Sequence, residues 1–222
     1  MNRFNRLNKS RVVVLVAVCI AAAMAHTASG QTGNSVSGQA IGIAATTPSG
    51  SLIPTPLATL AAGGGMSNTE IAAVSVPGVL TAQDVAATTT GVVGENASSA
   101  QSLVSASNVN VLNGIVSARQ LIVLASSASN GQQATSKGSS TIVDLVVNGV
   151  PMGVVSPAPN TTIDVPTVGT VVLNEQVTTG GGITDRGMNV TMIHVILKNS
   201  LTGATTGDIV VGRASSYAKF VR

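Results

Sequence analysis

The chain has few charged and very few aromatic residues. Charged side chains make up 9% of the 222 residues, aromatic side chains make up 1%, and there is no tryptophan. Typical globular domains have about 25% charged residues. Without basic clusters or interleaved aromatic residues, we expect no nucleic-acid binding. Hydrophobic residues still form 44% of the chain, which is the reverse of the low hydrophobicity of disordered proteins.

The excess of positive charge lies at the start of the chain. Residues 1–11 hold four of the eleven basic residues, and beyond Gly30 seven basic residues stand against eight acidic ones. An apolar run follows at residues 12–25, and Ala25 and Gly30 are the last residues before two candidate cleavage sites. This order predicts a secretory signal peptide over residues 1–30. The run is shorter than the ~20 apolar residues of a membrane helix, so we expect membrane contact only through this segment, before cleavage.

Cysteine and clustered metal ligands are also missing. Cys19, the one cysteine, lies inside the apolar run, and Val18 stands where a lipoprotein box needs a small residue. We interpret Cys19 as an ordinary residue of the apolar run with no specific role. The mature protein then has no disulfides, although export would permit them. Zinc needs clustered cysteine and histidine, and calcium needs several converging oxygens. The acidic residues are scattered singly, so we expect no metal site and no cofactor.

Residues that could carry catalysis are few and isolated. His26 leaves with the signal peptide or begins the mature chain, and His194 lies in an apolar segment without a partner nearby in the sequence. We interpret His194 as a structural residue. Asp144 and Glu175 are carboxylates in predicted strands. A glycosidase needs two acids facing each other across a cleft, and the sequence leaves open whether these two do so. Because no nucleophile or phosphate-binding motif occurs, we expect no enzyme and no catalytic residue.

Residues that favour strands and tight turns fill most of the chain. We predict a single antiparallel β-sandwich domain over residues 31–222, of jelly-roll or Ig-like type, with about nine or ten strands. Three segments are predicted to be something else: a proline-containing connection at 48–56, a short helix at 68–75 and a polar loop at 126–139. The strand at 188–198 is apolar on both faces, and we expect it in the middle of a sheet.

The strongest local signal is an Asn-Gly pair at residues 113–114, between two strand-like runs that span residues 101–125. Asn-Gly favours a two-residue hairpin turn, because both positions need positive φ. The turn predicts a register in which Leu103 faces Leu124. Alternation of side chains along the strands then predicts one core-facing set: Leu103, Val109, Val111, Val116, Ala118, Ile122 and Leu124. The opposite face has a polar centre of Asn108, Asn110, Ser117 and Arg119, which is our candidate for a partner contact.

A second Asn-Gly pair, at residues 148–149, predicts another hairpin over residues 141–155. In this hairpin Leu145 is expected to pair with Met152. Pro151 on the returning strand has no backbone N–H to donate, so we expect that strand to lie at the edge of a sheet or to break early.

Four late segments are distinctive through their order and spacing: STIVDLVVNG at 140–149, PNTTIDVPTVGTVVLNEQ at 159–176, NVTMIHVILKN at 189–199 and GDIVVGRASS at 207–216. Together they resemble the bacterial choice-of-anchor P family. The resemblance implies an exported, surface-associated β domain in a family named for its differing C-terminal sorting signals. This chain departs from that pattern, since it ends at Arg222 without such a signal. We therefore expect free secretion, or non-covalent association with the cell surface, with a periplasmic location left open.

The sequence is compatible with three functions. The favoured one is a secreted or cell-surface protein with a structural or adhesive role, whose partners are cell-envelope or extracellular-matrix components. The second is a polymerising filament subunit, in which residues 31–47 complete the sheet of a neighbouring copy by strand addition. The third is a carbohydrate-acting or carbohydrate-binding module. Such modules stack aromatic side chains on sugars, and beyond the leader only Tyr217 and Phe220 could do so.

Overall fold

The computed structural model describes residues 33–48 and 50–222, so the predicted signal peptide lies outside the described range. In these residues all regular structure is β-strand, and none of them forms a helix that is long and apolar enough to cross a membrane. The twelve strands are β1 (Ser35–Thr47), β2 (Gly50–Leu60), β3 (Gly64–Val76), β4 (Leu80–Val93), β5 (Ser98–Val111), β6 (Val116–Ser129), β7 (Ala134–Val147), β8 (Val150–Val155), β9 (Thr161–Val165), β10 (Gly169–Thr179), β11 (Asp185–Lys198) and β12 (Thr205–Lys219).

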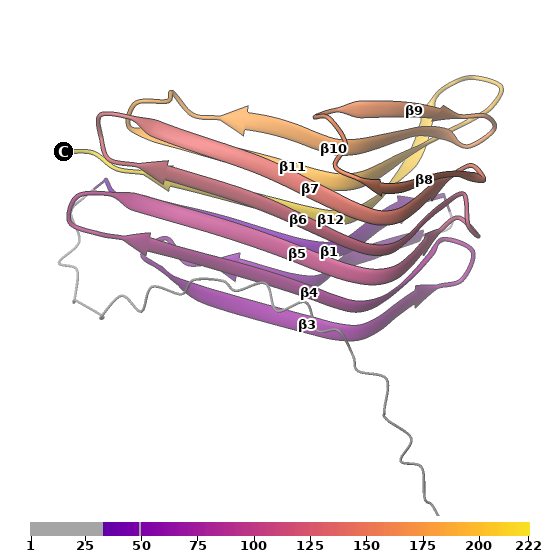
Figure 1. Ribbon diagram of the computed structural model, residues 1–222, viewed down its shortest axis with the longest axis horizontal. Helices are drawn as coiled ribbons and strands as arrows, with labels where there is room; N and C mark the ends of the chain where they lie inside the picture. Colours follow the sequence, from indigo (N-terminus) through magenta and orange to yellow (C-terminus); the bar gives the residue numbers. More distant parts are fainter. Residues whose placement is uncertain (1–32, 49) are drawn as a thin grey trace, which may run out of the picture.

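The strands form two six-stranded antiparallel sheets that stack as layers (Figure 1). Sheet A has the order β2-β1-β12-β11-β10-β9, and sheet B has the order β3-β4-β5-β6-β7-β8. The all-β fold and the two antiparallel sheets agree with the predicted sandwich. The strand order differs from the Greek-key order of jelly rolls and Ig-like domains, because sheet B is a plain meander. As predicted, β11 lies inside its sheet, between β10 and β12.

The three segments predicted to be irregular or helical are mostly strand in the described residues. Residues 50–60 form β2, which tolerates Pro54 and Pro56 because it is an edge strand. Residues 64–76 form β3, which pairs along its length with β4. A full ladder of hydrogen bonds to a neighbouring strand outweighs the weak local signal for a helix. The predicted polar loop is also mostly strand, since β6 and β7 are joined by a turn at residues 130–133.

The segment expected to complete a neighbour's sheet is already paired within its own chain. β1 lies between β2 and β12, with Val36 opposite Ala218 and Ala40 opposite both Ala58 and Ala214. Strand addition by residues 31–47 would therefore have to displace this strand from the interior of sheet A.

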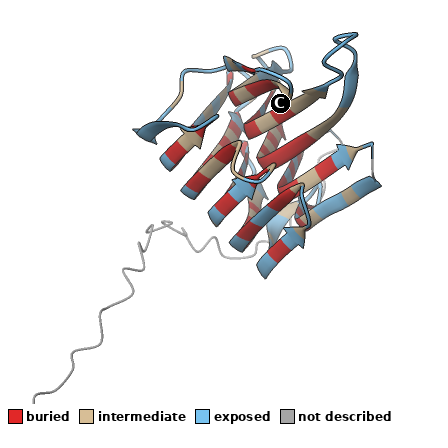
Figure 2. Cartoon of the chain, turned by 90° about the vertical axis from the view of Figure 1, so that its right-hand side faces the viewer, coloured by how far each residue is buried: buried red, intermediate tan, exposed pale blue. Residues whose placement is uncertain are grey.

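The core lies between the sheets and consists of aliphatic side chains. Figure 2 shows buried bands alternating with exposed bands along the strands. The largest fully buried side chains are Ile43, Leu121, Ile142, Leu145, Leu173, Met192, Ile193 and Ile209. They come from both sheets, so the hydrophobic effect joins the two layers without any disulfide between described residues.

Five of the long strands contain a residue with left-handed backbone geometry inside their ladders. These residues are Asp84 (φ 46°), Asn108 (48°), Asp144 (54°), Asn174 (52°) and Gly212 (69°). Asn, Asp and Gly are the residue types that best tolerate this region. The long strands also bend together towards one end of the molecule (Figure 1). We call this transverse row the bend line.

Side chains change faces at the bend line. The predicted register of the β5–β6 hairpin is confirmed, with Leu103 opposite Leu124. On the turn side of the line, Val109, Val111, Val116 and Ala118 are buried as predicted. Beyond the line the buried set is Val104, Ala106, Leu121 and Val123, while Leu103, Ile122 and Leu124 are only partly buried. The core assignment of these last three residues was wrong, because the alternation that the prediction assumed to be continuous is interrupted at Asn108 on β5 and between Ala118 and Leu121 on β6.

The second hairpin also departs from its prediction, by a shift of one residue in its register. β7 and β8 meet at the predicted turn, but Leu145 pairs with Gly153 instead of Met152, because the ladder contains a bulge. β8 is an edge strand of sheet B, which confirms the interpretation of Pro151.

Candidate functional site

The four residues of the predicted contact stripe lie together on the outer face of sheet B. Asn110 is paired with Ser117, and Asn108 and Arg119 occupy the next positions along the same two strands on this face. Asn108, Asn110 and Arg119 are exposed and Ser117 is half-buried. Their placement follows from the hairpin register, whereas their role in binding stays a prediction.

Hydrogen bonds extend this stripe onto the neighbouring strands. Asn108 Nδ2 donates to Gln83 Oε1 at 2.7 Å, and Ser107 Oγ donates to Asp84 Oδ2 at 2.8 Å. On the other side, Arg119 Nε donates to Asp144 Oδ2 at 2.6 Å. The result is a polar band across β4 to β7, made of Gln83, Asp84, Ser107, Asn108, Asn110, Ser117, Arg119 and Asp144. Side chains that are already oriented lose less conformational entropy when a partner binds.

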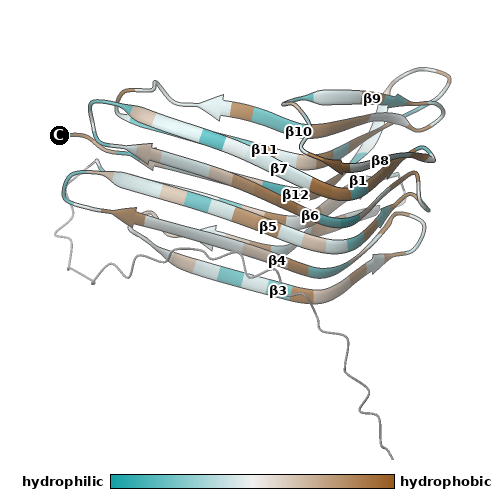
Figure 3. Cartoon of the chain, in the orientation of Figure 1, coloured by the Kyte–Doolittle hydropathy of each residue, from teal (hydrophilic) through white to brown (hydrophobic). Residues whose placement is uncertain are grey.

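An apolar patch lies beside the polar band on the same face. It consists of Leu103, Ile122 and Leu124, of which the two leucines are directly opposite each other. All three side chains remain partly exposed. Thr88 and Ser139 flank the leucines in the same row, and Figure 3 shows hydrophobic segments of β5 and β6 among paler ones. Sequence reasoning missed this patch, since it assigned these side chains to the core.

On the outer face of sheet A, His194 lies between two carboxylates. Its Nδ1 is 3.0 Å from Glu175 Oε2, and its Nε2 is 3.8 Å from Asp208 Oδ2. The acids come from β10 and β12, which flank β11, so the partners of His194 are distant in the sequence but adjacent in the sheet. The neighbours of His194 along β11, Ile193 and Val195, point into the core. The cluster is therefore on an open sheet face, and its hydrogen bond to Glu175 satisfies a partly buried ring.

This cluster is not a metal centre, and Asp144 and Glu175 do not form a carboxylate pair. Among the described residues, no group of three His, Cys, Asp or Glu side chains has a geometry that could hold a metal ion. Asp144 lies on sheet B and accepts a hydrogen bond from Arg119, whereas Glu175 lies on sheet A next to His194. The arrangement of two acids across a cleft, which the sequence left open, is not formed by these two residues.

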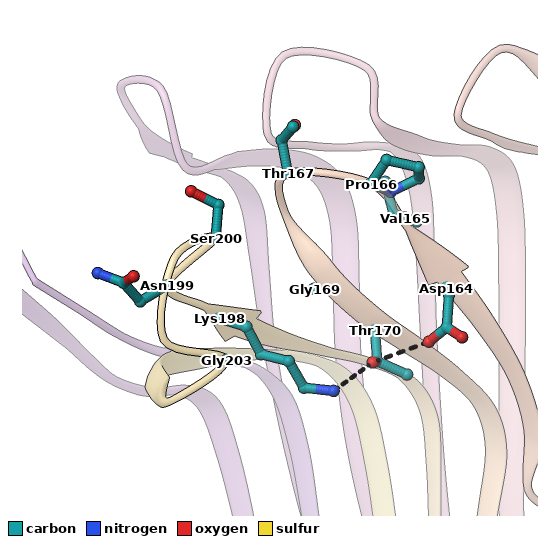
Figure 4. A pocket seen from close by; sticks show the side chains of 10 residues that line it. All are labelled: Asp164, Val165, Pro166, Thr167, Gly169, Thr170, Lys198, Asn199, Ser200 and Gly203. Carbon is teal, nitrogen blue, oxygen red and sulfur yellow. Dashed lines mark hydrogen bonds between the residues drawn. The ribbon is translucent and has the colours of Figure 1, made fainter.

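A shallow, open groove of about 310 Å³ lies at one end of sheet A, between the β9–β10 turn and the loop from β11 to β12. Figure 4 shows Lys198 reaching towards Thr170, with Asp164 on the far side. Lys198 Nζ donates to Thr170 Oγ1 at 2.9 Å, and that hydroxyl donates to Asp164 Oδ1 at 3.2 Å. Thr170 is buried, and it links the one cation and the one carboxylate of the groove.

The two aromatic residues near the C-terminus do not form a sugar-stacking surface. Phe220 is buried. Tyr217 lies on sheet A and donates from its hydroxyl to Asp185 Oδ2 at 3.2 Å. Partial burial, together with the hydrogen bond to Asp185 and the charge of that carboxylate, raises the pKa of Tyr217 above its ordinary value of 10.0.

Comparison with protein families and with curated proteins finds no match for this chain. Among solved structures, neisserial surface protein A (NspA) aligns with 84% of this chain and 97% of its own, at 12% sequence identity and a TM-score of 0.19. A TM-score this low does not establish a shared fold, so neither location nor function follows from it.

Proposed function

We propose that the protein is exported and acts, without catalysis, as a secreted or cell-surface protein with a structural or adhesive role. The observation that carries this proposal is the apolar patch next to the polar band on the outer face of sheet B. The predicted signal peptide and the resemblance to the choice-of-anchor P family support export to the cell surface or the medium.

The patch and the band together have the chemistry of a contact surface. Protein interfaces combine an apolar centre with a polar, hydrogen-bonding surround, and contiguous exposed apolar patches mark interaction sites. Leu103, Ile122 and Leu124 supply the apolar centre, and Asn108 and Arg119 belong to the polar surround. The partner that fits is a broad component of the cell envelope or the extracellular matrix, because a sheet face offers area rather than depth.

The test is the binding of fluorescently labelled protein, residues 31–222, to isolated cell envelopes and to matrix preparations. Replacing both Leu103 and Leu124 by Lys places charge in the apolar patch, and we expect at least a ~tenfold loss of binding. Thr135→Lys, at the far end of the same face, is the matched control and keeps wild-type binding. Unchanged binding by the double variant would reject sheet B as the contact face.

Self-association is the second candidate, and the edge strand β3 favours it. The other three edges are protected against pairing: β2 contains Pro54 and Pro56, β8 contains Pro151, and β9 has five residues. β3 has thirteen residues, no proline and a single charge at Glu70. Long edge strands without such protection are templates for pairing with another chain.

Sedimentation velocity over a range of protein concentrations tests this second candidate. Met66 is exposed on β3, and Met66→Lys adds a charge that blunts the edge. We expect concentration-dependent assembly in the wild type and its loss in this variant. A wild type that remains monomeric at every concentration excludes the filament role.

A further inference from the structure

We propose that the groove at the end of sheet A binds a hydroxyl-rich ligand, namely a single pyranose unit of a glycan. This site is on sheet A, whereas the proposed contact face is on sheet B. The two proposals are therefore independent of each other.

The polar groups of the groove suit a ligand that both donates and accepts hydrogen bonds. Thr170 accepts from Lys198 and donates to Asp164, which fixes the direction of its hydroxyl. An ammonium has three donors and a carboxylate has several acceptor positions, so both groups keep capacity for a ligand. A simple anion in the groove would be repelled by the carboxylate of Asp164, and a simple cation would be repelled by the ammonium of Lys198. Neutral hydroxyl groups meet neither penalty, because each can accept from the lysine and donate to the carboxylate.

The remainder of the lining suits the apolar side of a sugar ring. Pro166 is exposed and lines the groove next to its polar groups, and a pyranose presents C–H groups on its ring faces. The proline ring offers the flat apolar surface that an aromatic side chain provides in other sugar sites. A volume of about 310 Å³ is at the lower end of the ~300–1,000 Å³ typical of ligand sites. That volume is sufficient for one sugar unit.

One wall of the groove is a strained and firmly held turn. Thr167 has φ 67°, which is rare for a β-branched residue. Val168 N donates to Val165 O at 3.2 Å, and Lys198 N donates to Val168 O at 2.9 Å, which ties the turn to β11. Local strain of this kind persists where surrounding contacts over-determine the backbone, and it is frequent at binding sites.

The opposite wall is held in a similar way. Asn199 Oδ1 accepts from the backbone N–H groups of Leu201 and Thr202, at 2.9 and 3.0 Å. Both walls are therefore ordered before a ligand arrives, which lowers the entropy cost of binding.

The experiment records amide NMR spectra of isotope-labelled protein, residues 31–222, during titration with methyl glycosides of glucose, galactose, mannose and N-acetylglucosamine. We expect shifts centred on Thr170 and Lys198 with at least one glycoside, and a Kd on the order of 1 mM. Lys198→Met and Asp164→Asn should each weaken binding at least ~tenfold. Thr170→Ser, which keeps the hydroxyl, should bind like the wild type. Lys137→Met, on the outer face of sheet B, is the control and should change nothing.

Three results would overturn the proposal. The first is the absence of shifts at the groove with all four glycosides at concentrations well above ~1 mM. The second is tighter binding of acetate or methylammonium at the same residues, which would make the groove a site for a simple ion. The third is wild-type glycoside affinity in Lys198→Met, provided that its spectrum shows a folded protein.

Discussion

The outer faces of the two sheets have the same architecture but group their charged and apolar side chains differently. On sheet A, the strands β9 to β12 carry the charged residues Asp164, Glu175, His194, Lys198, Asp208 and Arg213. Many of these contact one another or a threonine, as Arg213 contacts Thr191 at 3.2 Å. Sheet A therefore holds these charged side chains in contacts with one another or with threonine, and its large exposed apolar residues are Ile53, Leu57 and Val177. Sheet B instead places partly exposed leucine and isoleucine side chains beside its polar band.

The difference shows why the face of sheet B is the better candidate for contact. Apolar surface in water costs about 25 cal/mol per Å², and a partner that covers it recovers this free energy. Charges that are already paired and half-exposed gain little from a further partner. The groove on sheet A differs from the rest of its face in that it combines a cation, a carboxylate and an apolar wall.

The largest expected effect tests whether the side chains of β5 and β6 change faces at the bend line. Leu121 points into the core and Leu124 points outward, although uninterrupted alternation had placed Leu124 in the core. Leu121→Ala should lower the free energy of unfolding by about 2–5 kcal/mol. Leu124→Ala should lower it by about 1 kcal/mol or less. Urea denaturation measures both, and equal losses would contradict the change of faces.

The bend line of sheet A can be disturbed at Gly212. A Cβ at this position would lie 3.3 Å from Val123 Cγ1 and 3.4 Å from Met192 Cβ, and φ is 69°. Gly212→Val should cost about 3 kcal/mol through strain and crowding together. Gly203 has φ 72° with open space around it, so Gly203→Val carries the strain without the crowding. If the two variants lose the same stability, crowding between the sheets at Gly212 is not significant.

Double-mutant cycles compare the ion pairs of the two faces. The Arg119–Asp144 pair on sheet B has side chains that are 63% and 55% exposed, whereas His194 and Glu175 on sheet A are 18% and 34% exposed. We expect a coupling free energy below about 0.5 kcal/mol for the exposed pair. For the less exposed pair of His194 and Glu175, we expect a coupling free energy of about 1 kcal/mol. Arg119→Met with Asp144→Asn, and His194→Gln with Glu175→Gln, provide the cycles. A larger coupling on sheet B would reverse the contrast between the faces.

The smallest expected effect is the pH dependence contributed by Tyr217. Burial and the contact with Asp185 raise its pKa, so folding favours the neutral phenol. The resulting stability is fully present below the unfolded pKa near 10.0 and is lost as pH rises through the folded pKa. Unfolding free energies measured from about pH 8 to about pH 11 should therefore fall more steeply in the wild type than in Tyr217→Phe. Parallel curves would show that the phenol contributes nothing to this fall.

Local chemistry was sufficient to predict part of the fold. The Asn-Gly pair at 113–114 gave the correct register of β5 and β6, because a two-residue turn leaves only one way to align its flanking strands. Pro151 indicated an edge strand because it lacks a backbone donor. The strand-forming composition indicated an all-β chain. These features depend on residues close in the sequence, or on totals that do not depend on arrangement.

The rest depended on neighbours that are distant in the sequence. Asn108 adopts a left-handed conformation beside Gln83 of β4, and beyond it Leu103 points outward instead of into the predicted core. His194 meets Glu175 and Asp208 only because β10 and β12 lie on either side of β11. The groove forms only where the β9–β10 turn meets the β11–β12 loop. The sequence by itself determined which segments pair locally; tertiary structure decided which side chains face outward, because packing of the two sheets selects backbone angles that local preference leaves open.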